Sequence, residues 1–245
     1  MRAALRTLCA ALFLNSFFFT FNYSHSIMDF ENIEFPSALF ITGIGTDVGK
    51  SFATGWLALK MNEAGKRTLT QKMIQTGNVG YSEDIERHRK IMNIPLQPED
   101  ENHLTAPVIF SYPCSPHLAA KIDKKEIDFN KISSSAEELL SKYPHLLIEG
   151  AGGLMVPLKD DYLTIDYIAE HNLPVVLVVN GQLGSINHIL LSLLAIRTYG
   201  LSLFAVVYNH FFDKDEVICA DTRDYISKCL KLNSPETLFI EMPAF

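Results

Sequence analysis

Two features are missing from the sequence: cysteines spaced as metal ligands and a cluster of basic residues. The four cysteines, at positions 9, 114, 219 and 229 of 245, form no C-x-x-C pair, which argues against a zinc finger and a disulfide framework. The 21 Lys and Arg are outnumbered by 28 Asp and Glu, and the net charge is -7. Nucleic acid is therefore not expected as the main partner, because neutralising its phosphates requires clustered cations.

The sequence also lacks internal repeats, low-complexity tracts and any long linker rich in Pro, Gly or Ser. Nothing in it marks a second domain. Because 48% of the residues are hydrophobic, a chain of this length can bury the core of one ordinary domain. We expect a single domain over residues 31–245.

The first 30 residues differ from the rest of the chain. Arg2 and Arg6 precede an apolar stretch, residues 8–21, and the small residues Ser24 and Ser26 follow. This is the outline of a secretory signal, although the stretch is too short and too interrupted by polar residues to be a convincing membrane span. The alternative is that translation begins at Met28. Either interpretation leaves residues 1–30 out of the fold.

Short apolar runs alternate along the chain with stretches of helical periodicity. The runs expected to form strands are residues 37–42, 67–74, 145–148, 174–179, 201–208 and 237–241. The stretches expected to form helices are residues 50–64, 82–92, 134–143, 185–199 and 216–232, and the stretch through Pro107, Pro113 and Pro116 is expected to be irregular. The alternation predicts an α/β fold with a doubly wound, mostly parallel sheet and helices on both faces. Ligands of such sheets bind beyond the carboxyl ends of the strands.

A glycine-rich loop lies between the first predicted strand and the first predicted helix. It reads Gly43-Ile44-Gly45-Thr46-Asp47-Val48-Gly49-Lys50-Ser51, with Phe52 next. Strand, loop and helix in this order are the context of a P-loop, whose backbone N–H groups surround phosphates while Lys50 reaches the outer ones. The hydroxyl of Ser51 is placed to ligate magnesium. The sequence therefore predicts a site for ATP and Mg²⁺ at residues 45–52.

The spacing of this loop departs from the strict P-loop pattern, because five rather than four residues separate Gly43 from Gly49. The variant resembles the loop of the dethiobiotin synthetase family, which usually reads Gly-Thr-Asp-Thr-x-Val-Gly-Lys-Thr. Related loops occur in ParA/MinD-type ATPases and in amidoligases. The loop alone therefore indicates the P-loop NTPase superfamily and leaves the reaction open.

Four further segments resemble the dethiobiotin synthetase family, and they occur in the family's order. Residues 71–77, Gln-Lys-Met-Ile-Gln-Thr-Gly, match its Lys-Pro-x-x-(Ser/Thr)-Gly pattern with Met73 in place of proline. The resemblance implies that Lys72 is the active-site lysine and that Thr76 contacts a diamine substrate. A lysine at that place can neutralise a carbamate and the γ-phosphate being transferred.

The next two segments supply acidic residues. Asp84 aligns with an aspartate that contacts magnesium and ATP in the family, with Glu83 as the alternative if the register slips by one; a helix cap is the other interpretation of this acid. Glu149 ends a buried strand, where a second magnesium ligand is expected. It opens the run Glu149-Gly150-Ala151-Gly152-Gly153. The small residues of this run let phosphate or substrate approach the backbone closely.

The fourth segment is residues 181–188, Gly-Gln-Leu-Gly-Ser-Ile-Asn-His, with Gln182 where a lysine is frequent in the family. The resemblance implies that Ser185 and Asn187 reach across a homodimer interface towards the substrate carboxylate in the neighbouring subunit. Asn209 aligns with the asparagine that reads the adenine edge, for which an amide offers both a donor and an acceptor. A Ser-Pro-His segment at 115–117 matches one that shapes the diamine pocket.

The resemblance covers residues 36–245 and implies an ATP-dependent ligase that makes dethiobiotin from diaminopelargonic acid and CO₂ in biotin synthesis. Such a site has little use outside the cytosol, so we favour a cytoplasmic protein with no membrane segment. A ParA/MinD-type ATPase is the first alternative, although its usual extra lysine early in the loop is absent. An amidoligase of the cobyrinate type would need a glutaminase region with a nucleophilic cysteine, and a degenerate nucleotide-binding relative is the third alternative.

Overall fold

The computed structural model describes residues 28–245 and contains a sheet of six parallel strands in the order β10-β9-β8-β1-β5-β2. Its strands are β1 (Ala38–Gly43), β2 (Thr68–Lys72), β5 (His145–Gly153), β8 (Val175–Asn180), β9 (Leu203–Asn209) and β10 (Leu238–Met242). The predicted α/β fold is therefore confirmed. The predicted leader falls almost entirely within residues 1–27, which lie outside the described residues.

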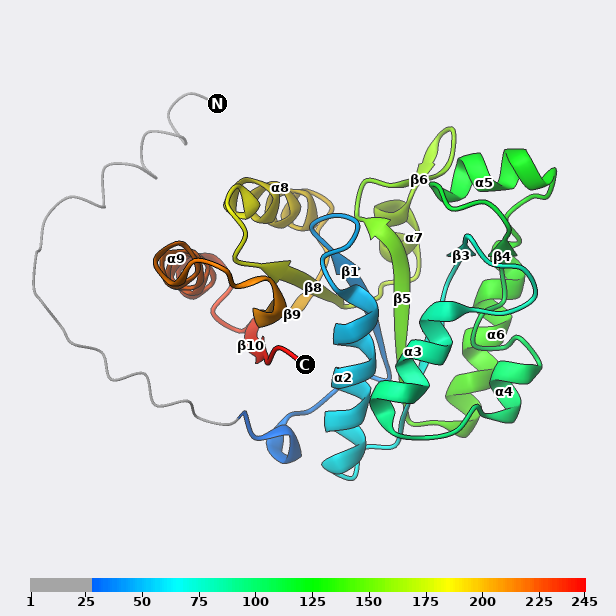
Figure 1. The fold of residues 1–245 in the computed structure, drawn as a ribbon, viewed down its shortest axis with the longest axis horizontal. Helices are drawn as coiled ribbons and strands as arrows, with labels where there is room; N and C mark the ends of the chain where they lie inside the picture. The colour runs from blue at the N-terminus through cyan, green and yellow to red at the C-terminus, as the bar shows by residue number, and fades with distance from the viewer. Residues whose placement is uncertain (1–27) are drawn as a thin grey trace, which may run out of the picture.

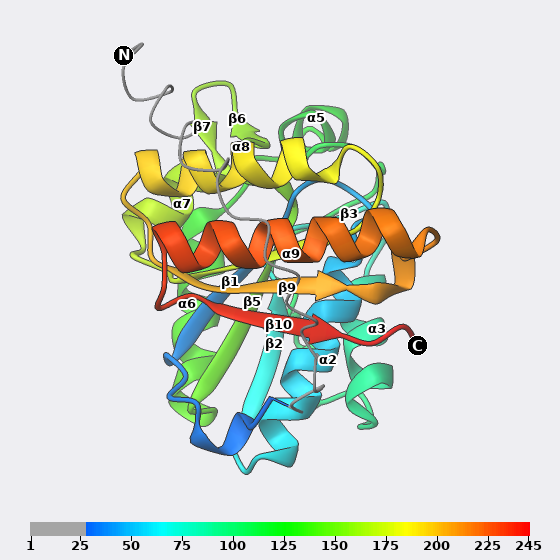
Figure 2. The same cartoon turned by 90° about the vertical axis from the view of Figure 1, so that its left-hand side faces the viewer.

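Helices cover both faces of this sheet (Figures 1 and 2). The longer ones are α2 (Lys50–Glu63), α3 (Glu83–Met92), α5 (Pro116–Asp123), α6 (Phe129–Lys142), α7 (Thr164–Glu170), α8 (Ser185–Thr198) and α9 (Glu216–Asn233). Shorter elements are η1 (Phe30–Asn32), β3 (Gln75–Thr76), α4 (Pro98–Glu101), β4 (Ile109–Phe110), β6 (Pro157–Lys159), β7 (Tyr162–Leu163) and η2 (His210–Phe212).

The core is divided by the sheet into two hydrophobic clusters. In β1, Phe40 belongs to the cluster beneath α6, α7, α8 and α9, whereas Leu39 and Ile41 belong to the cluster beneath α2 and η1. The same alternation runs through β5, β8 and β9, because successive side chains of a strand point to opposite faces. Central strands buried on both faces tend to be apolar throughout, which explains the continuous apolar runs of β8 and β9.

The parallel arrangement brings the carboxyl ends of the strands to one edge of the sheet. The loops that follow β1, β2, β5 and β9 all lie at this edge, and α2 begins where the loop after β1 ends (Figure 1). Residues that are far apart in the sequence therefore meet at this edge, as the fold class requires.

Several parts of the chain differ from the sequence prediction. Phe30 was expected outside the fold but is buried in the core, and α7 was not predicted. Helix α6 begins at Phe129 rather than at residue 134, because the Asp128 side chain caps it by accepting a hydrogen bond from the N–H of Lys131. The stretch expected to be irregular contains β4 and α5. Pro116 starts α5 because the first helical position has no use for an N–H group.

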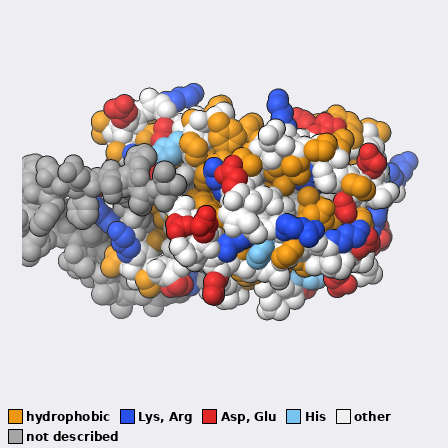
Figure 3. Space-filling model, turned by 90° about the horizontal axis from the view of Figure 1, so that it is seen from below, with side chains coloured by type: hydrophobic (Ala, Val, Ile, Leu, Met, Phe, Trp, Pro, Cys, Tyr) orange, Lys and Arg blue, Asp and Glu red, His pale blue; other side chains and the backbone are white. Residues whose placement is uncertain are grey.

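The surface carries charges of both signs. On the face shown in Figure 3, basic and acidic side chains are interspersed with hydrophobic ones. Among residues 28–245, no helix has both the length and the apolar character that crossing a membrane requires.

Candidate functional site

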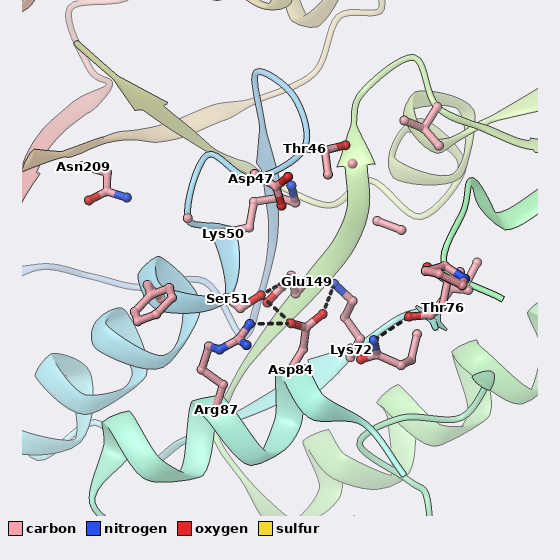
Figure 4. Close-up of a pocket in the computed structure, with 18 of the residues that line it drawn as sticks. Thr46, Asp47, Lys50, Ser51, Lys72, Thr76, Asp84, Arg87, Glu149 and Asn209 are labelled. Atoms are coloured by element: carbon pink, nitrogen blue, oxygen red, sulfur yellow. Dashed lines mark hydrogen bonds and ion pairs between the residues drawn. The ribbon is translucent and has the colours of Figure 1, made fainter. Parts of the chain in front are cut away.

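A pocket of about 640 Å³ opens at the carboxyl edge of the sheet. Most of the residues that the sequence singles out line it. They are Thr46, Asp47, Gly49, Lys50, Ser51, Phe52, Lys72, Thr76, Asp84, Glu149, Ala151, Gly152 and Asn209. Asn209 lies at one end of the group drawn in Figure 4 and Thr76 at the other, with Lys50, Ser51 and Glu149 between them.

The loop between β1 and α2 owes its shape to backbone conformations of the left-handed region. Asp47 has φ 58° and Gly49 has φ 89°. A Cβ atom on Gly49 would lie 2.2 Å from Nδ2 of Asn209, so this close approach requires glycine. The Asn209 amide donates to the carbonyl oxygen of Val48 at 3.1 Å and accepts from the N–H of Phe211 at 3.0 Å. Asn209 thus fastens the end of β9 to the loop.

Lys50 is the first residue of α2, and it is 7% exposed. Its Nζ donates to the carbonyl oxygen of Gly45 at 2.8 Å, across the loop. Burial lowers the pKa of Lys50 to about 8, although the nearby Glu149 carboxylate works in the opposite direction. Lys50 is therefore a desolvated cation, and this part of the pocket attracts anions.

Four side chains from separate elements meet in the middle of the pocket (Figure 4). Ser51 Oγ, at the start of α2, donates to Asp84 Oδ1 at 2.7 Å and lies 2.9 Å from Glu149 Oε1. Lys72 Nζ, at the end of β2, lies 2.7 Å from Asp84 Oδ2 and 2.7 Å from Glu149 Oε1. Asp84 is in the first turn of α3, and Glu149 lies in β5.

The buried charges of this group stabilise one another. Burial by itself would lower the pKa of Lys72, but the carboxylates of Glu149 and Asp84 outweigh it and raise this pKa to about 12. Burial by itself would raise the pKa of Glu149, which is fully buried, but Lys72 and His88 hold it well below its usual range. Both groups are therefore ionised at neutral pH.

The donor set of Ser51, Asp84 and Glu149 fits magnesium. Among the described residues, no three His, Cys, Asp or Glu are grouped as metal ligands. A P-loop requires only a hydroxyl and one or two carboxylates from the protein, because substrate phosphates and water complete the octahedron. The three side chains here offer only oxygen, the ligand that this cation prefers. One oxygen of each carboxylate, Asp84 Oδ1 and Glu149 Oε1, lies within 2.9 Å of Ser51 Oγ.

Met73, which replaces the proline of the family pattern, has a structural role. Its N–H donates to the carbonyl oxygen of Glu149 at 2.9 Å, a bond that proline could not make. It extends the pairing of β2 with β5 by one residue. The backbones that carry Lys72 and Glu149 are therefore held in register up to the site itself.

The end of the pocket around Thr76 has its own lining. Gln75, Thr76, Pro113, Cys114 and Ser115 form it, and β3 pairs with β4 beside it. The opposite end, near Asn209, is lined by Phe52, Phe211, Phe212, Met242 and Phe245. The sequence motifs located the polar residues of the pocket but predicted few of these apolar ones.

Some predicted residues do not line the pocket. Gly45, Val48 and Gly150 contribute backbone carbonyl groups, which accept from Lys50, Asn209 and Lys72 respectively. Ser185 and Asn187 lie at the start of α8 and are absent from the pocket lining. Gln182 is also outside it and bonds to Asn180.

His88 is the main residue that the sequence motifs missed. It is fully buried on α3, and its Nε2 lies 2.7 Å from Glu149 Oε2. A signal was available, because His88 stands four residues after Asp84 and residues at that spacing share one face of a helix.

A buried strand, a glycine-rich loop and a helix that begins with Lys50 and Ser51 define a P-loop nucleotide-binding protein of the α/β class. A family profile described as an AAA domain matches residues 37–234. A curated protein of Pasteurella multocida, named ATP-dependent dethiobiotin synthetase BioD 2, is 48% identical over 200 residues, which are 82% of this chain and 94% of that protein. One of Chlorobaculum tepidum, named ATP-dependent dethiobiotin synthetase BioD, is 47% identical over 201 residues, 82% of this chain and 84% of that protein.

A third relative, the BioD 2 protein of Haemophilus influenzae, is 51% identical over 177 residues, which are 72% of this chain and 93% of that protein. Similarity of this extent shows the family. The chain belongs to the dethiobiotin synthetases, as the motifs predicted.

Proposed function

We propose that this chain catalyses the ATP-dependent formation of dethiobiotin from diaminopelargonic acid and CO₂. One observation carries the proposal: Lys50, Ser51, Lys72, Asp84 and Glu149 come from four separate elements and converge on a single pocket. The P-loop class admits many phosphoryl-transfer reactions. Membership of the dethiobiotin synthetase family selects this one among them.

The reaction has three steps. One amine of the diamine adds to CO₂ and loses a proton, which gives a carbamate. A carbamate oxygen attacks the γ-phosphorus of ATP, and ADP leaves, so that a mixed carbamic-phosphoric anhydride forms. The second amine attacks the carbamoyl carbon, loses a proton and expels phosphate as the five-membered ureido ring closes.

The side chains of the pocket suit a reaction that needs positioning and charge neutralisation and no covalent nucleophile. We assign Lys50 to the outer phosphates and Lys72 to the carbamate and the transferred γ-phosphate. Ser51, Asp84 and Glu149 would hold magnesium, which neutralises phosphate charge when it is bound. Thr76 is assigned to the diamine, and Asn209 to the adenine.

The test is the formation of dethiobiotin, followed by mass spectrometry, with ATP, bicarbonate and diaminopelargonic acid. We expect ADP release to depend on the diamine, whereas a ParA/MinD-type ATPase would release ADP without it. Lys50→Ala and Lys72→Ala should abolish turnover. Lys60→Ala is the matched control, because Lys60 lies on the same helix as Lys50 but is exposed and paired with Glu63. Near-normal turnover in either pocket variant would contradict the role of that lysine.

We also propose that the protein is a homodimer that pairs through α8. Leu190, Leu191 and Leu194 are exposed on this helix by 38%, 56% and 48%, and Ser185 and Asn187 stand at its start, outside the pocket of their own chain. In the dimer, Asn187, which is exposed, would serve the site of the partner, whereas Ser185 is 4% exposed and is buried in its own chain. Leu191→Asp should yield monomers that bind ATP but make no dethiobiotin; a dimeric variant with normal turnover would contradict the interface.

A complementation experiment tests the shared site directly. Inactive Lys72→Ala and inactive Asn187→Ala protomers are unfolded, mixed and refolded together. If each site combines Lys72 of one chain with Asn187 of the other, mixed dimers hold one intact site and the mixture recovers about a quarter of the activity. No recovery would contradict the sharing.

Residues 31–245 are proposed to act as one ligase domain, and the protein to reside in the cytoplasm, where ATP is available. Cell fractionation of the full chain should place dethiobiotin-forming activity with the cytosol; activity in a secreted fraction would contradict this location.

A further inference from the structure

A row of buried polar side chains lies behind Glu149, on the side away from Lys72. His88 is fully buried, Arg89 is 2% exposed and Thr70 is 0% exposed. His88 Nε2 lies 2.7 Å from Glu149 Oε2, and its Nδ1 lies 3.0 Å from Thr70 Oγ1. Burying polar groups this deeply is unfavourable unless each has a hydrogen-bond partner. The side chains of this row therefore depend on the hydrogen bonds that they make with one another.

The donors of the row fix its direction. Arg89 can only donate, and its Nη1 donates to Thr70 Oγ1 at 2.7 Å. The Thr70 oxygen accepts this bond and still has a lone pair and a hydrogen for Nδ1 of His88, 3.0 Å away. At the other side of the ring the direction is fixed, because the ionised Glu149 carboxylate can only accept. Nε2 of His88 therefore carries a hydrogen and donates it to Glu149 Oε2.

The far end of the row is anchored. Arg89 makes two bonds to Asp100, at 2.8 and 2.7 Å, and Asp100 also accepts from the hydroxyl of Thr105 at 2.6 Å. The carbonyl oxygen of Thr105 accepts from the backbone N–H of Lys72 at 2.7 Å. The network therefore begins at Glu149 and returns to the residue that pairs with Glu149, which leaves His88 little freedom to move.

The two oxygens of Glu149 have separate partners. Oε1 faces the pocket, where it contacts Ser51 and Lys72. Oε2 is bonded to His88. The last torsion of a glutamate side chain is broad and weakly restrained, so the bond to Oε2 determines which oxygen is presented to the pocket and at what angle.

We propose that His88 is a positioning residue that holds Glu149 Oε2 and thereby sets the affinity of the site for its divalent cation. The inference rests on the proposed role of Glu149 as a magnesium ligand. Groups that orient metal ligands from behind change metal affinity or activity by about 10–100-fold when they are removed. Without His88, Oε2 would be a buried acceptor with no donor, and rotation of the carboxylate would misplace Oε1.

The test compares His88→Leu with His88→Gln. Leucine fills the space but donates nothing, whereas the amide nitrogen of glutamine can reach the place of Nε2. The readout is binding of a fluorescent ADP analogue as Mg²⁺ is added, together with Mn²⁺ binding followed by electron paramagnetic resonance. We expect His88→Leu to weaken cation affinity by about 10–100-fold and to leave metal-free nucleotide binding unchanged. His88→Gln should recover most of the loss.

Two results would overturn the inference: wild-type cation affinity in folded His88→Leu, or equal losses in the leucine and glutamine variants, which would show that only packing matters. If His88→Leu does not fold, Thr70→Val decides, because it keeps the ring and removes the hydroxyl that contacts Nδ1 of His88 and Nη1 of Arg89. A several-fold weaker cation affinity in Thr70→Val supports the inference, and unchanged affinity overturns it. These measurements need no dethiobiotin, so failure of the proposed reaction would be seen separately, in the turnover assay.

Discussion

The replacement of Lys72 by methionine tests the central ion cluster most directly. Methionine keeps most of the length of the side chain and removes the ammonium that contacts both Asp84 and Glu149 at 2.7 Å. Asp84 is 16% exposed and can regain water, but Glu149 is fully buried. The variant therefore leaves a buried carboxylate whose remaining side-chain contacts are Ser51 Oγ and Nε2 of His88.

The cost follows from the structure in two ways. Lys72 has a folded-state pKa of about 12, against an ordinary value of 10.5, and at neutral pH this shift alone corresponds to about 2 kcal/mol of stability. That contribution is complete below pH 10.5 and disappears as the pH rises through 12. Removing one partner of a buried ion pair usually costs about 3–5 kcal/mol. We expect Lys72→Met to destabilise the protein by about 2–5 kcal/mol.

Lys50→Met is the matched control, because both lysines line the same pocket and both are expected to be essential for turnover. The pKa of Lys50 is about 8 in the folded state and ordinarily 10.5, so keeping it charged at pH 7 costs stability. This cost is complete below pH 8 and fades as the pH rises towards 10.5. Removing the charge should leave stability unchanged or increase it by up to about 3 kcal/mol. Loss of the hydrogen bond from Lys50 to the carbonyl oxygen of Gly45 reduces this gain.

Urea unfolding at pH 7, without nucleotide or metal, measures both variants. We expect Lys72→Met to lose stability and Lys50→Met to keep or gain it, although both lysines line one pocket. The double variant Lys72→Met, Glu149→Gln should recover part of the loss, because the buried carboxylate is then neutral. Equal stability of Lys72→Met and the wild type would refute the buried ion cluster.

Two further predictions concern the loop after β1 and the ion pair between His210 and Glu241. Gly49→Ala must place a methyl group 2.2 Å from Asn209 at a positive φ, and should destabilise the protein by about 1–3 kcal/mol. Gly45→Ala is the control, because its methyl group meets no atom within 4 Å. Thermal unfolding compares the two variants, and equal melting temperatures would contradict the loop geometry. The Glu241 carboxylate raises the pKa of His210, so this stabilisation is complete below pH 6.5 and lost as the pH rises through the raised value. Urea unfolding of His210→Gln should show a deficit of about 1 kcal/mol or less that is larger at pH 6 than at pH 9, and a deficit independent of pH would contradict the ion pair.

The sheet could be predicted because its strands carry their own signal. Central strands covered on both faces form near-continuous apolar runs, and the runs at 174–179 and 201–208 could form few other structures. Short elements were less accessible. Helix α5 begins at the last of three closely spaced prolines, a pattern that suggested irregular chain. Only the position of Pro116 in the first turn distinguishes a helix start from a loop.

The candidate site was predictable as a set of residue types, but its contacts were not. The motifs placed Lys72, Asp84 and Glu149 near a phosphate loop. They gave no indication that Lys72 bridges both carboxylates or that His88 bonds to Glu149 from behind. Such contacts depend on how α3 packs against β2 and β5, which is a tertiary arrangement that single motifs do not encode.

The two lysines of the pocket differ in a way that bears on catalysis. Lys72 already has its counter-charges in the free protein, so its position is held before any substrate arrives. The only hydrogen-bond acceptor of the Lys50 ammonium among the described residues is the carbonyl oxygen of Gly45. The pKa of Lys50 is lowered because burial makes the charged form unfavourable and the nearby carboxylates do not compensate fully. A bound phosphate would supply that partner, and the unfavourable free energy of the empty loop would then be recovered as binding. A site built in this manner meets developing phosphate charge with a cation already in place, and it avoids the reorganisation that water would require. The unfavourable free energy of the charged Lys50 side chain in the free protein therefore results from the same arrangement that makes the loop a phosphate site.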